Sequence, residues 1–386
     1  MYRVLDAAER RVEAATAKMR AELRQNFGGE PQRWTGLLAR MTRARALAAS
    51  NSVEGINVSD EDAIAAIDSE DPVNTDRATW RAVMGYREAM DYILQRRQGT
   101  SFTITEDVLL AVHFMICQSD LSARPGQYRI GWVGVRNTIT GELVHEGASR
   151  DQLEPLIQEL LNYANDSEVE SVFLRAAMTH LNLVMLHPFK DGNGRTARCI
   201  QTAILANDGI VAPPFASIEE YIGHTQQDYY DVLTEVGGGG WHPERDAKPW
   251  VRYCLTGHYR QAKTLLRRTR ELVSVYAELL DLVQKYKLPE RMAMALLQAA
   301  IGSKVRNASY RVSVDVSNHL ASRDLKVLVD AGLLVPEGEK RGRFYLPSRT
   351  VAEIRTKLRL SKSVYDPFAP GSPPQASLAG QATFPL

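Results

Sequence analysis

The sequence has few cysteines, no long apolar run and almost no net charge. Its three cysteines, Cys117, Cys199 and Cys254, lie far apart without the C-x-x-C spacing of a zinc site or a redox dithiol, so we interpret them as buried thiols in a reducing compartment. No apolar stretch reaches the roughly 18 residues of a membrane span, and the N-terminus is charged almost at once. A net charge of +1 excludes a bulk field that would attract nucleic acid or an anionic membrane. We therefore expect a cytoplasmic globular protein, with no membrane partner, in which any basic patch is local.

What is present is mostly helical periodicity. Apolar residues recur every three or four positions over 5–23 and 37–47, which predicts two amphipathic helices, and similar patterns follow over 75–99, 105–118, 151–165, 169–186 and 196–207. Ser59 with Asp62 resembles a capping box at the start of a short helix. Only 127–144, with β-branched and aromatic residues around Asn137 to Gly141, predicts a hairpin in the first two thirds of the chain. The fold class that we expect is mainly α, a helical core that carries one β-hairpin.

The last third predicts a second, smaller module. After four glycines at 237–240, residues 250–280 predict one or two long helices. Residues 288–345 then predict three helices and two short apolar runs, an order similar to that of a winged helix-turn-helix, with 317–331 as the third helix and 333–345 as the wing. Beyond Ser361, five prolines and little apolar content predict disorder. With 386 residues the chain suits two or three domains, and we divide it into an N-terminal helical region 1–75, a core 76–282, a winged helix-turn-helix domain 283–350 and a largely disordered C-terminal extension 351–386.

One stretch of twelve residues, 187–198, concentrates groups suited to phosphate chemistry. Gly192 and Gly194 allow the backbone to approach a ligand, and together with the N–H groups of the helix that follows they predict an anion-binding turn. Arg195 and Arg198 are three residues apart on that helix, so they share a face and can reach one polyphosphate.

The same stretch supplies a candidate metal ligand and a candidate base. Asp191 is placed to hold a hard cation such as Mg²⁺ between phosphate oxygens. His187 lies at the end of the preceding helix, where a neutral imidazole could accept a hydroxyl proton. Taken singly, each of these residues has a plainer interpretation as a helix cap, a turn or a solvated face. Their occurrence together in a fixed order favours a functional site.

The stretch 187–198 resembles the defining motif of the Fic family, His-x-Phe-x-Asp/Glu-Gly-Asn-Gly-Arg-x-x-Arg, and fills every fixed position. The resemblance extends over about 35–280 and implies a protein adenylyltransferase, which transfers AMP from ATP to a Ser, Thr or Tyr hydroxyl of a protein and releases pyrophosphate. Residue by residue it implies the following roles: His187 as general base, Phe189 as anchor of the loop, Asp191 as Mg²⁺ ligand, Gly192, Asn193 and Gly194 as the phosphate cradle, and Arg195 and Arg198 as clamps on the β- and γ-phosphates.

The resemblance also implies how substrates are held. The hairpin at 127–144 occupies the place of the Fic flap, which pairs with the protein target as an added strand. The run 221–233 is similar to the helix that lines the nucleoside pocket, which makes Tyr229 a nucleotide-binding candidate, although one of Tyr229 and Tyr230 is expected to be a core residue. His180 is expected to be a packed structural histidine. Gly194 is similar to the AMP-transferring members and differs from the kinase-like branch, which has lysine there; transfer of UMP or phosphocholine stays open.

A further short motif lies N-terminal to the core. Residues 50–55, Ser-Asn-Ser-Val-Glu-Gly, resemble the Fic inhibitory motif Ser/Thr-x-x-x-Glu-Gly/Asn of the type with an N-terminal inhibitory helix. A carboxylate of Glu54 against Arg198 would occupy the guanidinium that the γ-phosphate needs. The resemblance therefore implies autoinhibition, and it also suggests that Glu54 assists removal of AMP from modified targets. The plainer alternative is that Glu54 only ends a helix ahead of Gly55.

The C-terminal module leaves the choice of partner open. Residues 303–345 hold eight Lys and Arg against five Asp and Glu, with Lys340, Arg341 and Arg343 at the tip of the expected wing. Arg323 and Lys326 could enter a DNA groove while the wing contacts the backbone, but winged helices also serve protein contacts and dimerisation. An alternative function is thus a DNA-binding regulator whose Fic module senses nucleotide. The sequence identifies neither the target protein nor the oligomeric state, and a homodimer stays open.

Overall fold

A computed structural model of the 386-residue chain describes residues 3–28, 33–96, 102–136, 140–169, 171–207, 216–339, 342–362 and 366–369. These residues are mainly helical, and the strands among them form two antiparallel hairpins. The mainly α fold class is therefore confirmed. No helix of this described part is long and apolar enough to cross a bilayer.

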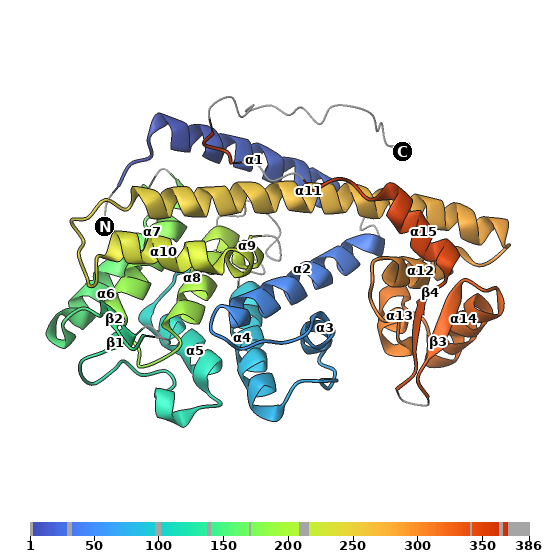
Figure 1. Ribbon diagram of the computed structural model, residues 1–386, viewed down its shortest axis with the longest axis horizontal. Helices are drawn as coiled ribbons and strands as arrows, with labels where there is room; N and C mark the ends of the chain where they lie inside the picture. The colour runs from blue at the N-terminus through green and yellow to red at the C-terminus, as the bar shows by residue number, and fades with distance from the viewer. Residues whose placement is uncertain are drawn as a thin grey trace.

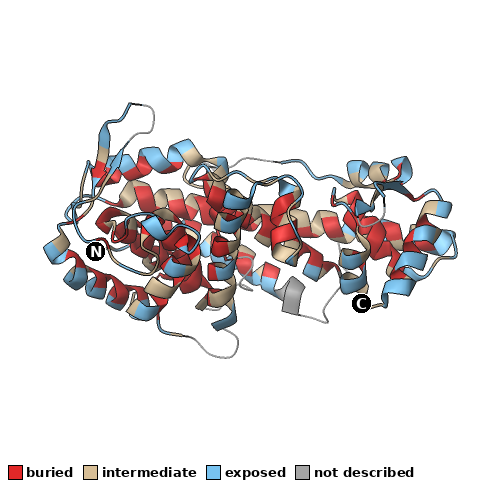
Figure 2. Ribbon diagram, turned by 90° about the horizontal axis from the view of Figure 1, so that it is seen from below, coloured by how far each residue is buried: buried red, intermediate tan, exposed pale blue. Residues whose placement is uncertain are grey.

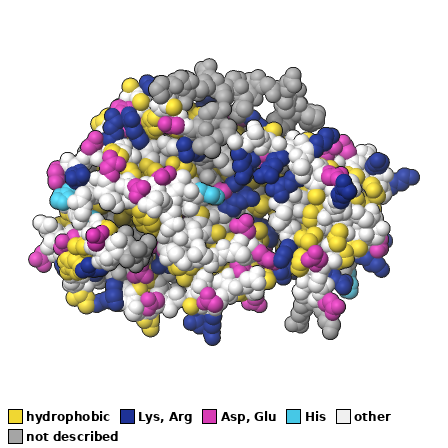
Figure 3. All heavy atoms as spheres, in the orientation of Figure 1, with side chains coloured by type: hydrophobic (Ala, Val, Ile, Leu, Met, Phe, Trp, Pro, Cys, Tyr) yellow, Lys and Arg dark blue, Asp and Glu magenta, His cyan; other side chains and the backbone are white. Residues whose placement is uncertain are grey.

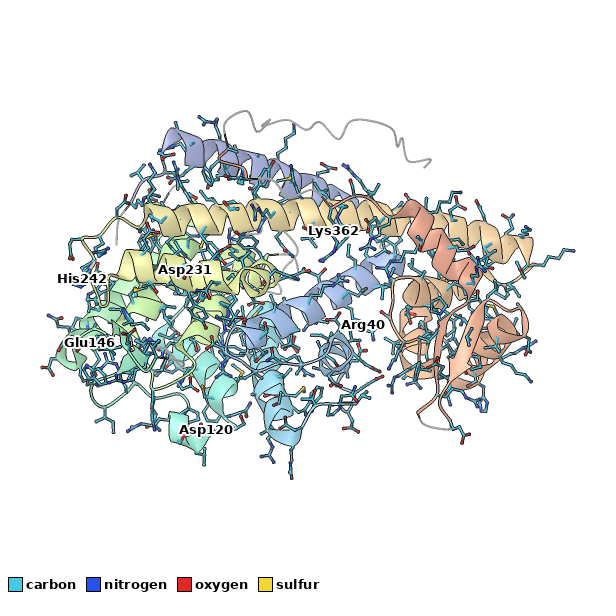
Figure 4. All side chains as sticks on the ribbon, in the orientation of Figure 1. Arg40, Asp120, Glu146, Asp231, His242 and Lys362 are labelled. Atoms are coloured by element: carbon cyan, nitrogen blue, oxygen red, sulfur yellow. The ribbon has the colours of Figure 1, made fainter. Side chains whose placement is uncertain are left out.

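The N-terminal helices are α1 (Ala7–Gly28), α2 (Arg33–Ser52) and α3 (Asp60–Asp68). α3 begins where Ser59 was expected to cap it: the Ser59 hydroxyl accepts a hydrogen bond from the Asp62 N–H at 3.0 Å. α2 packs closely on α9 (Glu219–His224), because a Cβ on Gly223 would lie 2.7 Å from the Ala49 Cβ. Arg40 of α2, labelled in Figure 4, is paired with Asp68 of α3. These contacts fix the C-terminal end of α2.

The centre of the chain is a group of helices around α7 and α8. It comprises α4 (Arg77–Arg96), α5 (Glu106–Cys117), the 3₁₀ turn η1 (Leu121–Ala123), α6 (Arg150–Asn165), α7 (Val172–Leu186) and α8 (Asn193–Asn207). The expected hairpin lies between α5 and α6 as β1 (Gly134–Arg136) and β2 (Leu143–Glu146). Gly134 pairs with Glu146 and Val135 with His145, and the register then shifts before Arg136.

One long helix spans most of the molecule. α10 (Gln226–Gly237) ends at Gly238, whose positive φ of 58° suits glycine, and α11 (Lys248–Lys285) then runs for 38 residues. The glycine-rich join and a single long helix agree with the sequence. α1 lies along one side of α11, while the C-terminal elements gather at its far end (Figure 1).

The C-terminal elements follow the predicted order of three helices and a hairpin. They are η3 (Glu290–Met292), α12 (Ala293–Ala300), α13 (Asn307–Val314), α14 (Asn318–Asp330), β3 (Leu334–Glu337), β4 (Phe344–Pro347) and α15 (Arg349–Leu358). Arg323, Lys326 and Arg343 are exposed, while Lys340 and Arg341 lie outside the described residues. DNA binding and the winged-helix assignment stay predictions.

α15 shows that the first part of the extension after residue 350 is helical, which the sequence analysis did not predict. Val351 of this helix is fully buried, and the helix packs on α11 and α12. The amphipathic spacing of Val351, Ile354 and Leu358 was the overlooked signal. Farther along, Phe368 packs against the first core with the Arg252 guanidinium over its ring. The expectation of disorder for 370–386 falls outside the described residues.

Two apolar cores lie under these elements (Figure 2). The first core surrounds α7 and α8 and takes in α4, α5 and the first half of α11. The second joins the C-terminal elements to the second half of α11. α1 and α2 contribute to both, since Val12 and Leu47 belong to the first core whereas Leu23 and Leu38 belong to the second. The N-terminal helices therefore bridge the region of α7 and α8 and the C-terminal elements.

Candidate active site: the loop between α7 and α8

The twelve-residue stretch forms the turn between α7 and the start of α8. α7 ends at Leu186, and His187 follows in the left-handed region with a φ of 50°, its N–H bonded to the Leu183 carbonyl at 3.1 Å. Gly192 also has a positive φ of 76°, and α8 begins at the next residue. A Cβ at Gly192 would lie 2.6 Å from the Cys117 sulfur, so glycine is required there for space as well as for φ.

The His187 imidazole is neutral and presents one free lone pair. Its Nδ1 lies 3.2 Å from the Val184 carbonyl oxygen, which can only accept, so Nδ1 carries the hydrogen and Nε2 is left as a base. Burial lowers the pKa of His187 from 6.5 to about 4, and the nearby His145 and Arg129 act in the same direction, although the Val184 bond opposes them. This is the protonation state that a general base needs at neutral pH.

Phe189 anchors the loop in the core, as the sequence predicted. Its ring is fully buried and stacks on the His113 ring with centroids 3.7 Å apart, with Tyr128 on its other side at 5.6 Å. Asn193 closes the turn by two hydrogen bonds to the Phe189 backbone, accepting from its N–H at 2.9 Å and donating to its carbonyl at 3.0 Å. The Asn193 side chain thus stabilises the conformation of the loop through the Phe189 backbone. This role differs from direct contact with phosphate.

Two supporting residues have no signal in the sequence. His113 accepts a hydrogen bond from the Gly126 N–H on Nδ1 at 3.0 Å, so its Nε2 carries a hydrogen and donates it to the Asp191 carbonyl at 3.0 Å. Arg129 donates from Nε to the His187 carbonyl at 2.8 Å, and its backbone N–H donates to the Pro188 carbonyl at 3.0 Å. These bonds join the loop to segments more than 50 residues away in sequence, where no periodicity or motif marks the partners.

Asp191 and Arg195 line an open pocket beside the loop, together with residues of α4 and α5. The Asp191 side chain is 61% exposed, and one of its oxygens lies 3.6 Å from Arg195 Nη2. Arg195 is mostly buried, and its Nε has no hydrogen-bond partner in the described part of the chain. A buried N–H without a partner is costly, so the geometry leaves a donor available for an anion.

Arg198 is the most enclosed charge of the site. Its side chain is 1% exposed, and it donates from Nε to the Ser50 hydroxyl at 2.7 Å, from Nη2 to the Ser50 carbonyl at 2.9 Å, and from Nη2 to the Glu54 carboxylate at 2.8 Å. Burial opposes its charged form, but the Glu54 carboxylate outweighs burial and raises the pKa of Arg198. The structure therefore brings Ser50, Glu54 and Arg198 together.

The Glu54 carboxylate also covers the glycine turn. A Cβ on Gly194 would lie 2.5 Å from Glu54 Oε1, so the carboxylate lies directly over the start of α8. The turn that carries Glu54 is held by its neighbour Val53, whose carbonyl accepts hydrogen bonds from Tyr230 OH at 2.7 Å and from Gln226 Nε2 at 3.1 Å. Gly55 completes the turn with a φ of 75°. Glu54 thus occupies the space over the anion-binding turn.

The two tyrosines of α10 differ in their surroundings. Tyr229, the nucleotide-binding candidate, is 2% exposed and packs between His180 and Trp250, with its hydroxyl 3.1 Å from His180 Nε2. Tyr230 is 41% exposed and contacts the Glu54 turn. The structure therefore gives Tyr229 the core position that was expected for one of the two, while its role in nucleotide binding stays a prediction. His180 is fully buried, as expected of a packed histidine.

The hairpin lies beside His187. A Cβ on Gly147, directly after β2, would lie 3.0 Å from the His187 Cβ, and the Ala148 N–H donates to the Leu186 carbonyl at 3.3 Å. Large apolar side chains are exposed along this segment, namely Ile130, Trp132, Val135 and Leu143. Glu146, labelled in Figure 4, accepts a hydrogen bond from the Trp132 indole N–H at 2.6 Å. Residues 137–139 of the expected hairpin lie outside the described residues.

Comparison with known families and proteins agrees with this geometry. Residues 103–205, which include α5, the hairpin, α7 and the loop, match the family model described as the Fic/DOC family. The chain contains a Fic/DOC domain. The loop with His187 and Arg198 lies within the matched residues, as does the hairpin.

Relatives of the Fic domain carry an enzymatic name. The chain is 27% identical over 208 residues to protein adenylyltransferase Fic of Nematostella vectensis, covering 51% of this chain and 44% of that protein. It is 34% identical over 99 residues to protein adenylyltransferase fic-1 of Caenorhabditis elegans, covering 25% of this chain and 17% of that protein. The chain therefore spans less than half the length of these two curated relatives.

Solved Fic structures share the fold. A Fic family protein from Desulfovibrio desulfuricans G20 superposes with a TM-score of 0.59 at 21% identity, covering 90% of this chain and 98% of that one. Fic-1 of Caenorhabditis elegans (residues 134–508) superposes with a TM-score of 0.52 at 21% identity, covering 67% of this chain and 72% of that one. The likeness to the first extends beyond the Fic domain over most of the chain.

The neutral state of His187 can be measured directly. We predict that its imidazole titrates with a pKa near 4, since burial disfavours the charged ring, and that it stays neutral from pH 5.5 upward. Carbon-detected NMR of histidine-labelled protein gives this value, with the resonance assigned from its loss in His187→Gln. A titration midpoint near 6.5 would show that the ring is solvated and would contradict the site geometry.

Proposed function

We propose that this protein is an adenylyltransferase that transfers AMP from ATP to a hydroxyl of a protein target. The observation that carries the proposal is the Fic loop itself, in which a neutral His187, a glycine turn at a helix start and two buried arginines lie within one short segment. The names of the relatives, protein adenylyltransferase, agree with this chemistry. The structure gives no sign of which base is preferred, so ATP is proposed on the resemblance.

The proposed transfer uses the free lone pair of His187. Nε2 accepts the proton of the target hydroxyl while the hydroxyl oxygen attacks the α-phosphorus of ATP. The bond from the α-phosphorus to its bridging oxygen breaks, and pyrophosphate leaves. His187 then holds one proton that is passed to solvent. The Val184 carbonyl keeps the imidazole oriented and fixes the tautomer throughout.

The phosphates of ATP would lie over the start of α8. The backbone of Gly192 to Gly194 forms the cradle, and the Asn193 side chain keeps it in shape. Arg195, with its unpaired Nε, and Arg198 would contact the β- and γ-phosphates. Phosphate binding would explain why two buried guanidinium groups lie on one face of α8, a helix that begins at a glycine turn.

Mg²⁺ is the cation that this site would accept. The described residues contain no group of three His, Cys, Asp or Glu side chains, so the protein would not hold a cation by itself. The exposed Asp191 carboxylate fits a cation shared with phosphate oxygens, which is the usual arrangement for Mg²⁺. When bound, the ion would neutralise charge on the phosphates and the leaving pyrophosphate.

The target segment would lie along the hairpin at 127–144. Exposed Trp132, Val135 and Leu143 offer apolar contacts, and a strand added to β1 or β2 would pass close to His187. Backbone pairing would position a Ser, Thr or Tyr hydroxyl with little dependence on the target sequence. The exposed apolar side chains of the hairpin support a protein substrate over a small molecule.

Autoinhibition by Glu54 is part of the proposal. The Glu54 carboxylate occupies Arg198 Nη2 and lies over Gly194, where a γ-phosphate would need both the guanidinium and the space. ATP bound beside Glu54 would be misaligned for attack on its α-phosphorus. The same carboxylate, close to the turn, could also assist a water molecule in removing AMP from a modified target, so de-AMPylation is a secondary proposal.

One prediction of the proposed function concerns His187→Ala. We expect transfer of label from α-labelled ATP to proteins in a lysate to fall by at least about 100-fold, because a general base contributes about that factor or more. Nucleotide affinity should stay within a few-fold, since the cradle at Gly192 to Gly194 is unchanged. His242→Ala, an exposed histidine labelled in Figure 4, is the matched control and should label normally. Undiminished labelling by His187→Ala would exclude this residue from the mechanism.

The second prediction concerns Glu54→Gly. Removal of the carboxylate frees Arg198 Nη2 and the space over Gly194, so automodification should rise by about tenfold or more, the scale of one charge-assisted hydrogen bond. Asn57→Gly adds the same backbone freedom to the same segment without contacting Arg198, and it should label like the wild type. Equal labelling by wild type and Glu54→Gly would refute the inhibitory role, and activation by Asn57→Gly would assign the effect to backbone freedom.

A further inference from the structure

A second group of arginines lies away from the Fic loop, where α2, α11 and α15 meet. These helices line an open pocket. Its walls carry Arg45 of α2, Arg268 and Glu271 of α11, and Arg355 and Arg359 at the end of α15. Lys and Arg side chains gather on the surface over the region where these helices converge (Figures 1 and 3). We call this the junction pocket.

The charges of the junction pocket are only partly compensated. Arg268 makes two bonds to the Glu220 carboxylate, at 2.7 Å and 2.5 Å, and is fully paired. Glu271 accepts from Arg267 at 2.6 Å and from the Leu360 N–H at 2.9 Å. In contrast, Arg45 and Arg359 have no hydrogen bond or ion pair with any residue that the structure describes. The pocket lining thus holds four cations and one carboxylate.

The arginines repel one another in a partly desolvated space. Burial lowers the pKa of Arg45, and the neighbouring Arg268 adds to this effect, while the carboxylates of Glu220 and Asp60 oppose it. Burial also lowers the pKa of Arg355, with Arg359 acting in the same direction and Glu271 in the opposite one. Arg355 has one fixed contact, from Nη1 to the Ala300 carbonyl at 3.1 Å, which leaves the rest of its guanidinium for another acceptor. Guanidinium groups held close together without enough carboxylates are stabilised by an added anion.

We propose that the junction pocket binds a small phosphate-type oxyanion, such as inorganic phosphate or pyrophosphate, between Arg45, Arg355 and Arg359. The planar array of N–H donors on a guanidinium group matches two oxygens of a phosphate. An anion that carries more than one negative charge would compensate the excess positive charge. The apolar floor formed by Leu272 and Val275 offers no competing acceptor. The site is separate from the Fic loop and draws its ligands from different helices.

A bound anion would link α2 to the end of α15. Arg45 belongs to α2, whose end carries Ser50 and the Glu54 turn, while Arg355 and Arg359 belong to the C-terminal elements. Occupancy would therefore resist withdrawal of α2 from its present position. The regulatory consequence rests on the proposed function, because it requires that Glu54 inhibits transfer, whereas anion binding itself does not depend on it.

Calorimetric titration of pyrophosphate and of phosphate into the full chain tests the proposal. At constant ionic strength we expect a site that persists in Arg195→Gln, because that variant weakens the Fic loop and leaves the junction pocket intact. Arg45→Gln and Arg359→Gln should each weaken this site by about tenfold or more, the effect of losing one charge-assisted hydrogen bond. Arg359 is exposed, so its replacement is not expected to disturb folding, and melting temperatures check both variants.

Arg349→Gln is the matched control, because Arg349 lies on the same helix, is 92% exposed and is not part of the pocket lining. It should leave the affinity unchanged. Three outcomes would overturn the proposal: no pyrophosphate or phosphate binding at millimolar concentration, equal weakening by Arg349→Gln, which indicates only a general positive field, or loss of the site in Arg195→Gln, which places the anion at the Fic loop. All three outcomes are measured as anion binding. A failure of Glu54→Gly to activate AMP transfer would therefore leave this test unaffected.

Discussion

The contact between Arg198 and the end of α2 is the constraint on which the arrangement of the site depends. A guanidinium that is 1% exposed is costly unless an anion and hydrogen-bond acceptors compensate it, and here Ser50 and Glu54 supply both. The same guanidinium is proposed to hold a phosphate of ATP. Under this proposal Glu54 and phosphate would compete for one donor, and the closeness of Glu54 to Gly194 would prevent both from taking their full positions.

Contacts with the rest of the domain hold the loop between α7 and α8 in one position. His113 and Arg129 bond to backbone carbonyls of the loop, Asn193 closes it, and Phe189 fixes it in the core, so the loop has little freedom to yield when the occupant of Arg198 changes. The Glu54 turn follows the end of α2. It is held by its own backbone hydrogen bonds, by the burial of Val53 and the hydrogen bonds to its carbonyl, and by the packing of α2 against α9. We therefore expect regulation to act by moving α2, with the loop as the fixed partner.

Much of this could be predicted from the sequence because its signals are local. Helical periodicity identified most of the helices, and the order of residues in 187–198 placed the candidate base His187 in a loop and the two arginines on the helix that follows it. Contacts between distant segments could not be predicted in this way. His113 and Arg129 support the loop through the backbone, which any sequence offers, and nothing near them distinguishes their role. Tyr229 and Tyr230 are adjacent and chemically alike, so only packing assigns one to the core. α15 was missed because prolines farther along the chain dominated the interpretation of the extension.

The central claim is that Glu54 and Arg198 act through one contact, and a double-mutant cycle on automodification tests it most directly. Rates would be measured for wild type, Glu54→Gly, Arg198→Ala and the double variant, with nucleotide binding as the check that each is folded. We expect Glu54→Gly to activate the wild type, Arg198→Ala to weaken transfer, and the activation by Glu54→Gly to vanish almost completely when Arg198 is absent. Equal activation by Glu54→Gly in both backgrounds would contradict the claim, because the two residues would then act independently.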